Sequence, residues 1–262
     1  MRILFVGDVV GRPGRDAVEE LLPGLRERLD VDACIVNAEN VANGVGVTPR
    51  LAERLLAAGA DALTLGNHTW RREEIGPYLA TATAVVRPAN FQAAAPGRGL
   101  AVVPARDGTP VAVLNLLGSL FLDPAQSLWE VVDALVEEAR ASTPVVVVDI
   151  HAEATSEKVA LAAWLDGRVT AVLGTHTHVQ TSDARVLPGG TAALTDVGMT
   201  GPHDSVIGVE ADLAIRRMRT GMPVRFETAT GGVRLEGALV TCDPATGRAS
   251  AIEPVRVPWP AT

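Results

Sequence analysis

Short runs of apolar, β-branched residues recur through the first three quarters of the chain, and their length and composition are typical of buried strands. We expect strands at residues 2–7, 32–37, 61–66, 110–116, 144–150 and 169–174. Helical patterns lie between several of these runs, at residues 14–29, 49–58, 125–141 and 155–165. This alternation predicts crossover connections and mostly parallel strands that are covered by helices.

The pattern changes after about residue 183, where strand-like segments follow one another between Gly, Pro and Asp residues. Strands are expected there at residues 184–188, 191–197, 224–230, 233–241 and 250–257, with one helix near 209–218. Pro23 is expected to split or kink the first helix. No Ser/Gly-rich tract, charge run or internal repeat divides the chain, so we expect one α/β domain over residues 1–262.

Composition narrows the class of protein. Hydrophobic residues make up 47% and charged residues 21%, with a mean hydropathy of +0.21, which predicts a large buried core. The net charge of −8 argues against broad binding to a nucleic-acid backbone. No signal peptide or membrane span is evident, so we expect a soluble, cytoplasmic protein without a membrane partner. Cys34 and Cys242 are expected to be reduced core residues.

Polar clusters follow five of the expected strands. Ligands in open α/β sheets bind outside the carboxyl ends of the strands, so clusters that are far apart in sequence can converge on one site. Four of the five histidines lie in these clusters. The candidate residues are Asp8 in VGD, Glu39 and Asn40 in VNAEN, Asn67 and His68 in LGNH, His151 in VDIH, and His176 and His178 in LGTHTH.

Each cluster alone has a plainer interpretation as a helix cap, a turn or a structural histidine. The pair His176 and His178 is the strongest single signal, because alternate residues of an extended chain point the same way. Carboxylates, an amide oxygen and imidazoles without thiolates suit Fe or Mn, with Zn or Mg as alternatives. A carboxylate such as Glu39 can bridge two ions about 3.5 to 4 Å apart. The pattern therefore predicts a site for two divalent metal ions.

The order of these motifs resembles that of the calcineurin-like metallophosphoesterases, whose pattern is GDxH, GDxxD, GNHE, a lone His and GHxH. Two positions depart from that pattern. Val10 stands where the first motif usually has a ligating histidine, and Glu39 replaces the usual bridging aspartate. The first ion is therefore expected to have fewer protein ligands and more water.

With these two departures, the sequence resembles the YmdB family of bacterial metallophosphoesterases. The matching strings are GDVVGRPGR, NAENVANG, LGNHTW, RPANF, HAEATSEK, GTHTHVQT and TDVGMTGP. The resemblance implies a calcineurin-like α/β fold, with two mixed β-sheets sandwiched by helices in an α/β/β/α arrangement. It also implies a phosphodiesterase for which 2′,3′-cyclic nucleotides are the favoured substrates.

Site roles are implied by position within the same motifs. One ion would be held by Asp8, Glu39 and His178, and the other by Glu39, Asn67, His151 and His176. Asn40 would lie in or beside the first shell of ligands, and His68 would contact the scissile phosphate.

Several other polar residues carry weaker signals. Arg12 and Arg15 follow Asp8, where they could help to receive a phosphate or could be surface charge. The segment 155–158 resembles a helix cap, although Lys158 could reach a substrate. Asp196 is expected to orient a ligand histidine, and His203 is expected to be exposed and without a role.

The expected reaction is hydrolysis of a small phosphodiester by a hydroxide held between the two ions, with His68 protonating or stabilising the departing oxygen. The alternatives are a phosphomonoesterase or 5′-nucleotidase-like activity, a metal hydrolase acting on C–N bonds, and a metal-binding regulator without catalysis. An amidohydrolase would carry its HxH pair on the first strand, whereas here the pair comes last. A homo-oligomer is compatible with the sequence.

Overall fold

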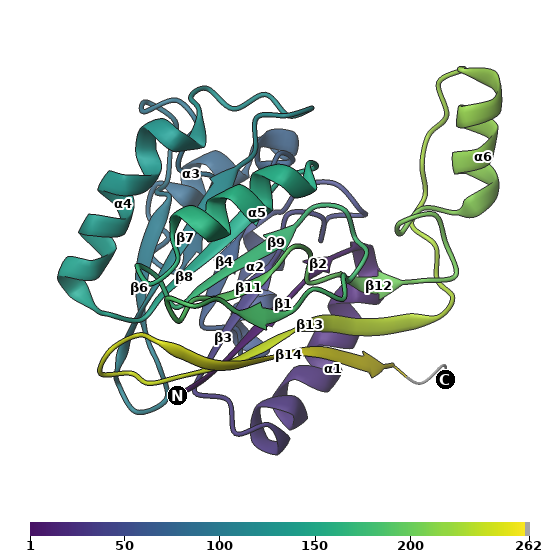
Figure 1. Ribbon diagram of the computed structural model, residues 1–262. Coiled ribbons are helices and arrows are strands. Elements are labelled where there is room, and N and C mark those ends of the chain that lie inside the picture. Colours follow the sequence, from purple (N-terminus) through teal and green to yellow (C-terminus); the bar gives the residue numbers. More distant parts are fainter. Residues whose placement is uncertain (260–262) are drawn as a thin grey trace.

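The computed structural model describes residues 1–259, and two β-sheets form its centre (Figure 1). The first sheet contains β1 (Arg2–Val6), β2 (Asp8–Val9), β3 (Ala33–Asn37), β4 (Ala62–Thr64), β5 (Val85–Val86), β12 (Met199–Pro202), β13 (Val233–Cys242) and β14 (Ala249–Pro258). The second sheet has the order β10 (Arg185–Val186), β11 (Ala192–Leu194), β9 (Ala171–Thr175), β8 (Val146–His151), β7 (Pro110–Leu117) and β6 (Leu100–Pro104).

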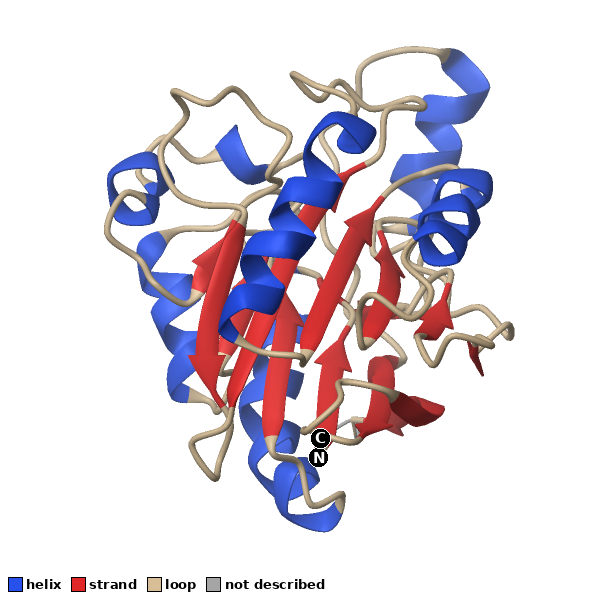
Figure 2. Cartoon of the chain, turned by 60° about the vertical axis from the view of Figure 1, so that its left-hand side comes forward, coloured by secondary structure: helices blue, strands red, loops and turns tan. Residues whose placement is uncertain are grey.

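Helices cover the outer faces of both sheets (Figure 2). α1 (Gly11–Arg28), α2 (Pro49–Ala57) and α3 (Ile75–Leu79) share one hydrophobic cluster with the first sheet. α4 (Leu128–Ser142) and α5 (Thr155–Trp164) share another with the second sheet. A 3₁₀ turn spans Thr69–Arg71, and α6 (Ala211–Thr220) stands away from both sheets (Figure 1). The α/β/β/α layering expected from the sequence is confirmed.

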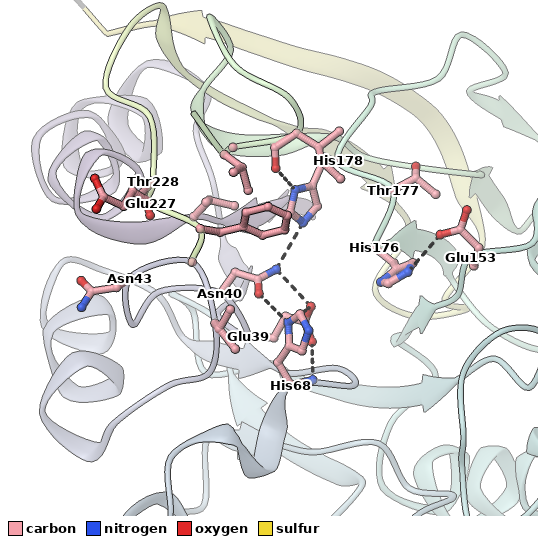
Figure 3. Close-up of a pocket in the computed structure, with 17 residues that line it drawn as sticks. Glu39, Asn40, Asn43, His68, Glu153, His176, Thr177, His178, Glu227 and Thr228 are labelled. Atoms are coloured by element: carbon pink, nitrogen blue, oxygen red, sulfur yellow. Dashed lines mark hydrogen bonds and ion pairs between the residues drawn. The ribbon is translucent and has the colours of Figure 1, made fainter. Parts of the chain in front are cut away.

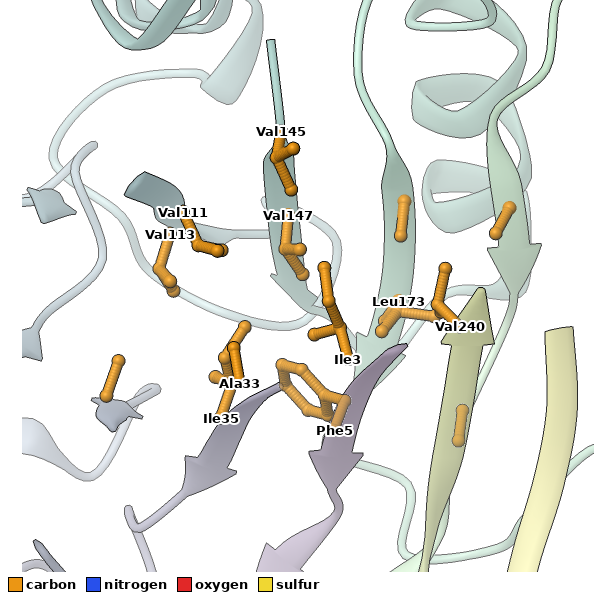
Figure 4. Packing of buried hydrophobic residues seen from close by; sticks show 14 of the residues in the cluster. Ile3, Phe5, Ala33, Ile35, Val111, Val113, Val145, Val147, Leu173 and Val240 are labelled. Atoms are coloured by element: carbon orange, nitrogen blue, oxygen red, sulfur yellow. The ribbon is translucent and has the colours of Figure 1, made fainter. Parts of the chain in front are cut away.

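The alternation of side chains along each strand explains the layers. In β1, Ile3 and Phe5 point toward the second sheet, whereas Leu4 and Val6 pack against the helices of the first. Figure 4 shows Val111, Val113 and Val147 on the other side of the same interface. Strands that are buried on both faces have continuous runs of apolar residues, so they could be predicted from the sequence.

Register brings the carboxyl ends of the parallel strands to one edge of each sheet. In the first sheet Val36 pairs with both Val6 and Leu63. In the second, His151 pairs with both Leu117 and Thr175. The loops that follow these strands therefore emerge side by side, and these loops carry the predicted polar clusters.

Some local expectations were wrong. α1 begins at Gly11 and is not split at Pro23, because its buried face, including Leu22 and Leu25, packs in the same cluster as the first sheet on both sides of the proline. Residues 224–230 contain only an isolated bridge at Thr228 instead of a strand. The short strands β5 and β6 and the helix α3 had not been expected.

Both cysteines are free and buried, as expected. Burial raises the pKa of the Cys34 thiol, so this side chain remains an unreactive thiol within the core. Within residues 1–259, no helix is both long enough and apolar enough to cross a lipid bilayer.

Candidate metal centre

The structure brings all five predicted clusters together at the carboxyl ends of the strands. Glu39 lies at the centre of the group and is 1% exposed. Its Oε1 atom is 3.2 Å from His151 Nε2, and its Oε2 atom accepts a hydrogen bond from the backbone N–H of His68 at 3.1 Å. Asn40 Nδ2 donates to Glu39 Oε1 at 3.0 Å. Figure 3 shows the contacts among Glu39, Asn40 and His68 along one wall of a cavity.

Gly66, which begins the GNH sequence, is required by close packing beside Glu39. A Cβ atom built on Gly66 would lie 2.3 Å from Glu39 Oε2 and 2.5 Å from His151 Nε2. Any larger residue would push these two side chains out of place, since contacts under 3.0 Å cannot be accommodated. The glycine therefore belongs to the construction of the site.

His151 is fixed from behind by a buried relay. Thr175 Oγ1 donates a hydrogen bond to Asp149 Oδ1 at 2.7 Å, so it must accept one from His151 Nδ1, 2.8 Å away. Asn37 Nδ2 donates to the other oxygen of Asp149 at 3.0 Å. The relay places a proton on Nδ1 and turns Nε2 toward Glu39, as outer partners of metal-binding histidines do.

His176 and His178 are each held through one ring nitrogen as well. His176 Nε2 lies 3.0 Å from Glu153 Oε2, and His178 Nδ1 donates to the backbone oxygen of Ile207 at 2.9 Å. The second nitrogen of each ring faces the centre. His176 Nδ1 is 3.1 Å from His151 Nε2, and His178 Nε2 is 3.7 Å from Asp8 Oδ1. Three rings are thus oriented with one nitrogen directed inward.

The inward-facing atoms are mostly hydrogen-bond acceptors. His151 Nε2 lies within 3.2 Å of Glu39 Oε1, Asn67 Oδ1 and His176 Nδ1, and a single proton cannot serve all three. Asp8 Oδ1 is buried and lacks a hydrogen-bond partner within residues 1–259. Acceptors crowded in this way are a group that cations would satisfy, and Glu39, His151 and His176 form a cluster of metal-binding type.

The crowding of these groups determines which of them carry a proton in the absence of metal. Burial opposes ionisation of Glu39, but the charges and hydrogen bonds of His151 and His68 outweigh it and lower the pKa of Glu39. Burial alone would lower the pKa of His151, yet the Glu39 carboxylate raises it to about 9. Burial, with the charge of His151, lowers the pKa of His176 to about 3. Burial also raises the pKa of Asp8. A proton on His151 therefore occupies the centre when no metal is bound.

His68 lies at the edge of the group, with its side chain 27% exposed. His68 Nδ1 donates to Asn40 Oδ1 at 2.8 Å, which leaves Nε2 as the nitrogen able to act on a bound molecule. Asn40 Nδ2 also contacts His178 Nε2 at 3.2 Å. Asn40 therefore connects His68 with both Glu39 and His178, and its amide oxygen is engaged by His68.

The loop that carries His176 and His178 is not extended, so the expected geometry of this pair was wrong. β9 ends at Thr175, and both histidines have positive φ angles, of 99° and 65°. Asp196 holds this loop by accepting from the backbone N–H and the hydroxyl of Thr177, at 3.1 and 2.7 Å. Backbone strain of this kind persists where surrounding contacts fix it. Asp196 thus acts on the loop between the histidines instead of on an imidazole ring.

Lys158 is excluded from substrate contact, because it is 3% exposed and its ammonium group donates to Asp196 Oδ2 at 2.9 Å. α5 begins after Ala154, whose methyl side chain cannot cap a helix. Glu157 instead accepts from the backbone N–H groups of Ser119 and Leu120. The predicted capping segment at 155–158 was therefore wrong.

The arginines near Asp8 have separate roles, and neither lines the cavity. Arg12 is exposed and pairs with Asp16, whereas Arg15 is buried and donates to the backbone oxygen of Val41. The expectation for His203 was wrong as well. Its side chain is 14% exposed, donates from Nε2 to the backbone oxygen of Met199 at 3.1 Å and lies near the buried carboxylate of Glu236.

Some residues of the site had not been anticipated. Glu153 and Thr175 orient two of the histidines, and both stand within two residues of a predicted site residue in sequence. Ile207 accepts from His178 through its backbone oxygen, a contact that carries no sequence signal. Phe226 and Thr228 line the same cavity from a segment that the sequence had assigned to a strand.

Comparison with known proteins agrees with this architecture. A family model described as YmdB-like protein matches residues 4–255. The chain belongs to the YmdB-like family. It is 48% identical over 257 residues to a 2′,3′-cyclic-nucleotide 2′-phosphodiesterase of Bacillus subtilis, a match that covers 98% of this chain and 97% of the relative. The resemblance to the YmdB family predicted from the motifs is confirmed.

Solved structures extend the comparison. A hypothetical protein from Thermus thermophilus is 42% identical to this YmdB-like chain, with a TM-score of 0.92 and coverage of 99% of this chain and 100% of the other. A phosphatase from Mycoplasma pneumoniae is 34% identical, with a TM-score of 0.90 and coverage of 98% and 93%. The calcineurin-like phosphoesterase YfkN of Bacillus subtilis is 12% identical, with a TM-score of 0.59 and coverage of 98% and 90%, which shows the fold alone. The calcineurin-like fold is confirmed.

Proposed function

We propose that this YmdB-like protein is a cytoplasmic phosphoester hydrolase that cleaves 2′,3′-cyclic nucleotides with the help of two divalent metal ions. The proposal is supported above all by the hydrogen-bond acceptors that gather around Glu39. Three histidines belong to this group, and each has one ring nitrogen in an outer contact and the other directed toward the centre. The name of the relative in Bacillus subtilis supports the choice of substrate.

The contacts support a division of the candidate ligands into two overlapping sets. Asp8, Glu39 and His178 would hold one ion, because His178 Nε2 and Asp8 Oδ1 face each other. The remaining inward atoms cluster around His151 Nε2, so the second ion would be held by Glu39, Asn67, His151 and His176. Asn40 lies beside the first set, and we propose that it chiefly positions His68. Fe or Mn suits these ligands best, with Zn or Mg as alternatives.

Metal ions bound here would supply positive charge for the phosphate oxygens and would lower the pKa of a bound water. The protein contributes the fixed orientation of the rings and a proton-transfer group. His68 lines the cavity with Nε2 unengaged, so it would stabilise or protonate the oxygen that leaves phosphorus. Asn40 would fix the orientation of the His68 ring, because Asn40 Oδ1 accepts a hydrogen bond from His68 Nδ1.

The alternatives remain separable by experiment. Purified protein loaded with Mn²⁺ or Fe²⁺ should hydrolyse 2′,3′-cyclic nucleotides faster than linear phosphodiesters, and both faster than phosphomonoesters, amides or esters. The measurement is kcat/KM for each substrate in one panel. A preference for phosphomonoesters would favour the phosphatase alternative, and activity on amides would favour a C–N hydrolase. Metal-loaded protein that cleaves none of them would favour a regulator without catalysis.

Metal binding should strengthen with pH between 7 and 9. The pKa of His151 is about 9 without metal, so below that pH a metal ion must displace a proton from Nε2. One displaced proton gives an affinity that rises about tenfold per pH unit and levels off above pH 9. His176 does not add to this slope, because its pKa is about 3. Competition with a calibrated chelator at several pH values measures the slope, and a flat profile would contradict this protonation scheme.

A further inference from the structure

Two chemically different groups of side chains line the cavity at the candidate metal centre. Its volume is about 430 Å³, which lies within the range of small-molecule sites. One group carries carboxylate, amide and imidazole functions. The other group is apolar and consists of Val10, Val45, Ile207, Val209 and Phe226.

The polar side chains alone have the groups that metal ions and a phosphate require, so the apolar side chains are available to another part of the bound molecule. Figure 3 shows Asn43, Glu227 and Thr228 on the side of the cavity opposite His176 and Glu153. A molecule that spans the cavity therefore presents its phosphate to one side and its remaining atoms to the other.

Among the described residues on the wall of this cavity, Phe226 is the one Phe, Tyr or Trp side chain, and it is 44% exposed. The guanidinium of Arg217, on α6, lies 5.4 Å from the centre of the phenyl ring. Arg217 does not line the cavity, and its guanidinium lies over the ring as in a cation–π contact. One face of Phe226 is thus occupied by a cation while the ring remains accessible from the cavity.

The segment that carries Phe226 is fixed to the metal centre. Gly11 has a φ of +60°, and a Cβ atom there would lie 2.7 Å from the side chain of Thr228. The backbone N–H of Ala229 donates to Gly208 O at 3.0 Å, and the neighbouring Ile207 O accepts from His178. These contacts hold residues 226–229 at a constant position relative to the candidate ligands, which a preformed binding surface requires.

We propose that Phe226 is a stacking platform for the nucleobase of the substrate. The proposal rests on the proposed function, because it assigns the apolar lining around Phe226 to the base of a cyclic nucleotide whose phosphate lies at the candidate metal ligands. Stacking suits this position, since an exposed aromatic ring offers its face to a planar base whatever the identity of that base. Phe226 is therefore a residue that selects for the presence of a base.

The test compares two cyclic phosphodiesters that differ in the base. Metal-loaded wild type, Phe226→Ala and Phe226→Leu are assayed with 2′,3′-cyclic AMP and with glycerol 1,2-cyclic phosphate, which has no base. Phe226→Ala should raise KM for cyclic AMP about 5- to 100-fold while kcat changes less than about twofold. For the cyclic glycerol ester, kcat/KM should fall by less than about twofold.

Leucine separates stacking from simple apolar contact. Phe226→Leu should behave nearly as alanine does, whereas full recovery by leucine would overturn the stacking assignment. Met218→Ala is the matched control, because Met218 lies on the neighbouring helix α6, is exposed and does not line the cavity. This control should match wild type with both substrates.

Failure of the platform can be told from failure of the proposed function. If wild type cleaves both esters and Phe226→Ala has an unchanged KM for cyclic AMP, the platform is wrong and the phosphodiesterase stands. If wild type cleaves neither ester, calorimetry with adenosine 3′-monophosphate and glycerol 3-phosphate still tests the platform. Wild type should bind the nucleotide about 5- to 100-fold more tightly than Phe226→Ala does, with no such difference for glycerol 3-phosphate. Equal nucleotide binding by the two proteins would overturn it.

Discussion

Replacing Glu39 with alanine is expected to remove both bound metal and activity. Glu39 Oε1 lies 3.2 Å from His151 Nε2, and Asn40, which donates to the same oxygen, also contacts His178. The carboxylate is thus connected to both proposed ligand sets, directly to His151 and through Asn40 to His178. Its loss should lower metal content from about two ions per chain to one or none. Turnover should fall by at least about 10³-fold, because the phosphate charge is then poorly compensated.

Elemental analysis and kcat for one 2′,3′-cyclic nucleotide measure the two effects on the same samples. Glu138→Ala is a suitable control, because Glu138 is an exposed residue of α4 and its substitution removes an equal charge away from the site. Cys34→Ala should also retain activity, because the thiol is buried in the core. Turnover near wild type in Glu39→Ala would refute the bridging role. A reproducible maximum of one ion in wild type would refute the dinuclear centre.

The layers of the fold were predictable because buried parallel strands leave a strong signal. A strand such as β1, in which Ile3 to Val6 are all buried, reads as one apolar run. The prediction of a strand at 224–230 was wrong because the alternation of apolar and polar side chains along an extended chain looks the same with or without a partner strand. Its Phe226 and Thr228 face the cavity instead of a sheet.

The convergence of the site was predictable from one rule, that loops after parallel strands share an edge. The outer contacts were not, since they depend on tertiary packing. Thr175 orients His151 only because adjacent strands place them side by side. The backbone oxygen of Ile207 could belong to any residue. Lys158 resembles a substrate-binding cation in sequence, and only its burial against Asp196 shows otherwise.

The chemical role of His68 leads to a different expectation from that of Glu39. Burial foremost lowers the pKa of His68, with the charge of His151 adding to the effect, so the free enzyme holds it neutral at pH 7. A phosphate anion bound beside the ring would favour its protonated form. The Nδ1 proton is already donated to Asn40, so the proton for a leaving oxygen would be carried on Nε2.

His68→Ala should keep roughly the wild-type metal content, because its ring is bound to Asn40 and is not needed to fill either proposed ligand set. Turnover of a 2′,3′-cyclic nucleotide should fall about 10²- to 10⁴-fold, the range for loss of a general acid. Asn67→Ala provides the contrast, since it should lose metal together with activity. Loss of one ion from His68→Ala would instead make His68 a ligand.

A series of diesters with different leaving groups decides what His68 does. An oxygen that departs readily as an anion gains little from protonation, so the defect of His68→Ala should shrink toward wild type for activated aryl diesters. In wild type, kcat on unactivated substrates should fall as pH rises through the pKa that His68 has in the substrate complex, because the acid form is then lost. His68→Ala should lack this decline of kcat with rising pH. Equal defects on activated and unactivated diesters, with the same pH profile in both proteins, would assign His68 to phosphate binding instead of proton transfer.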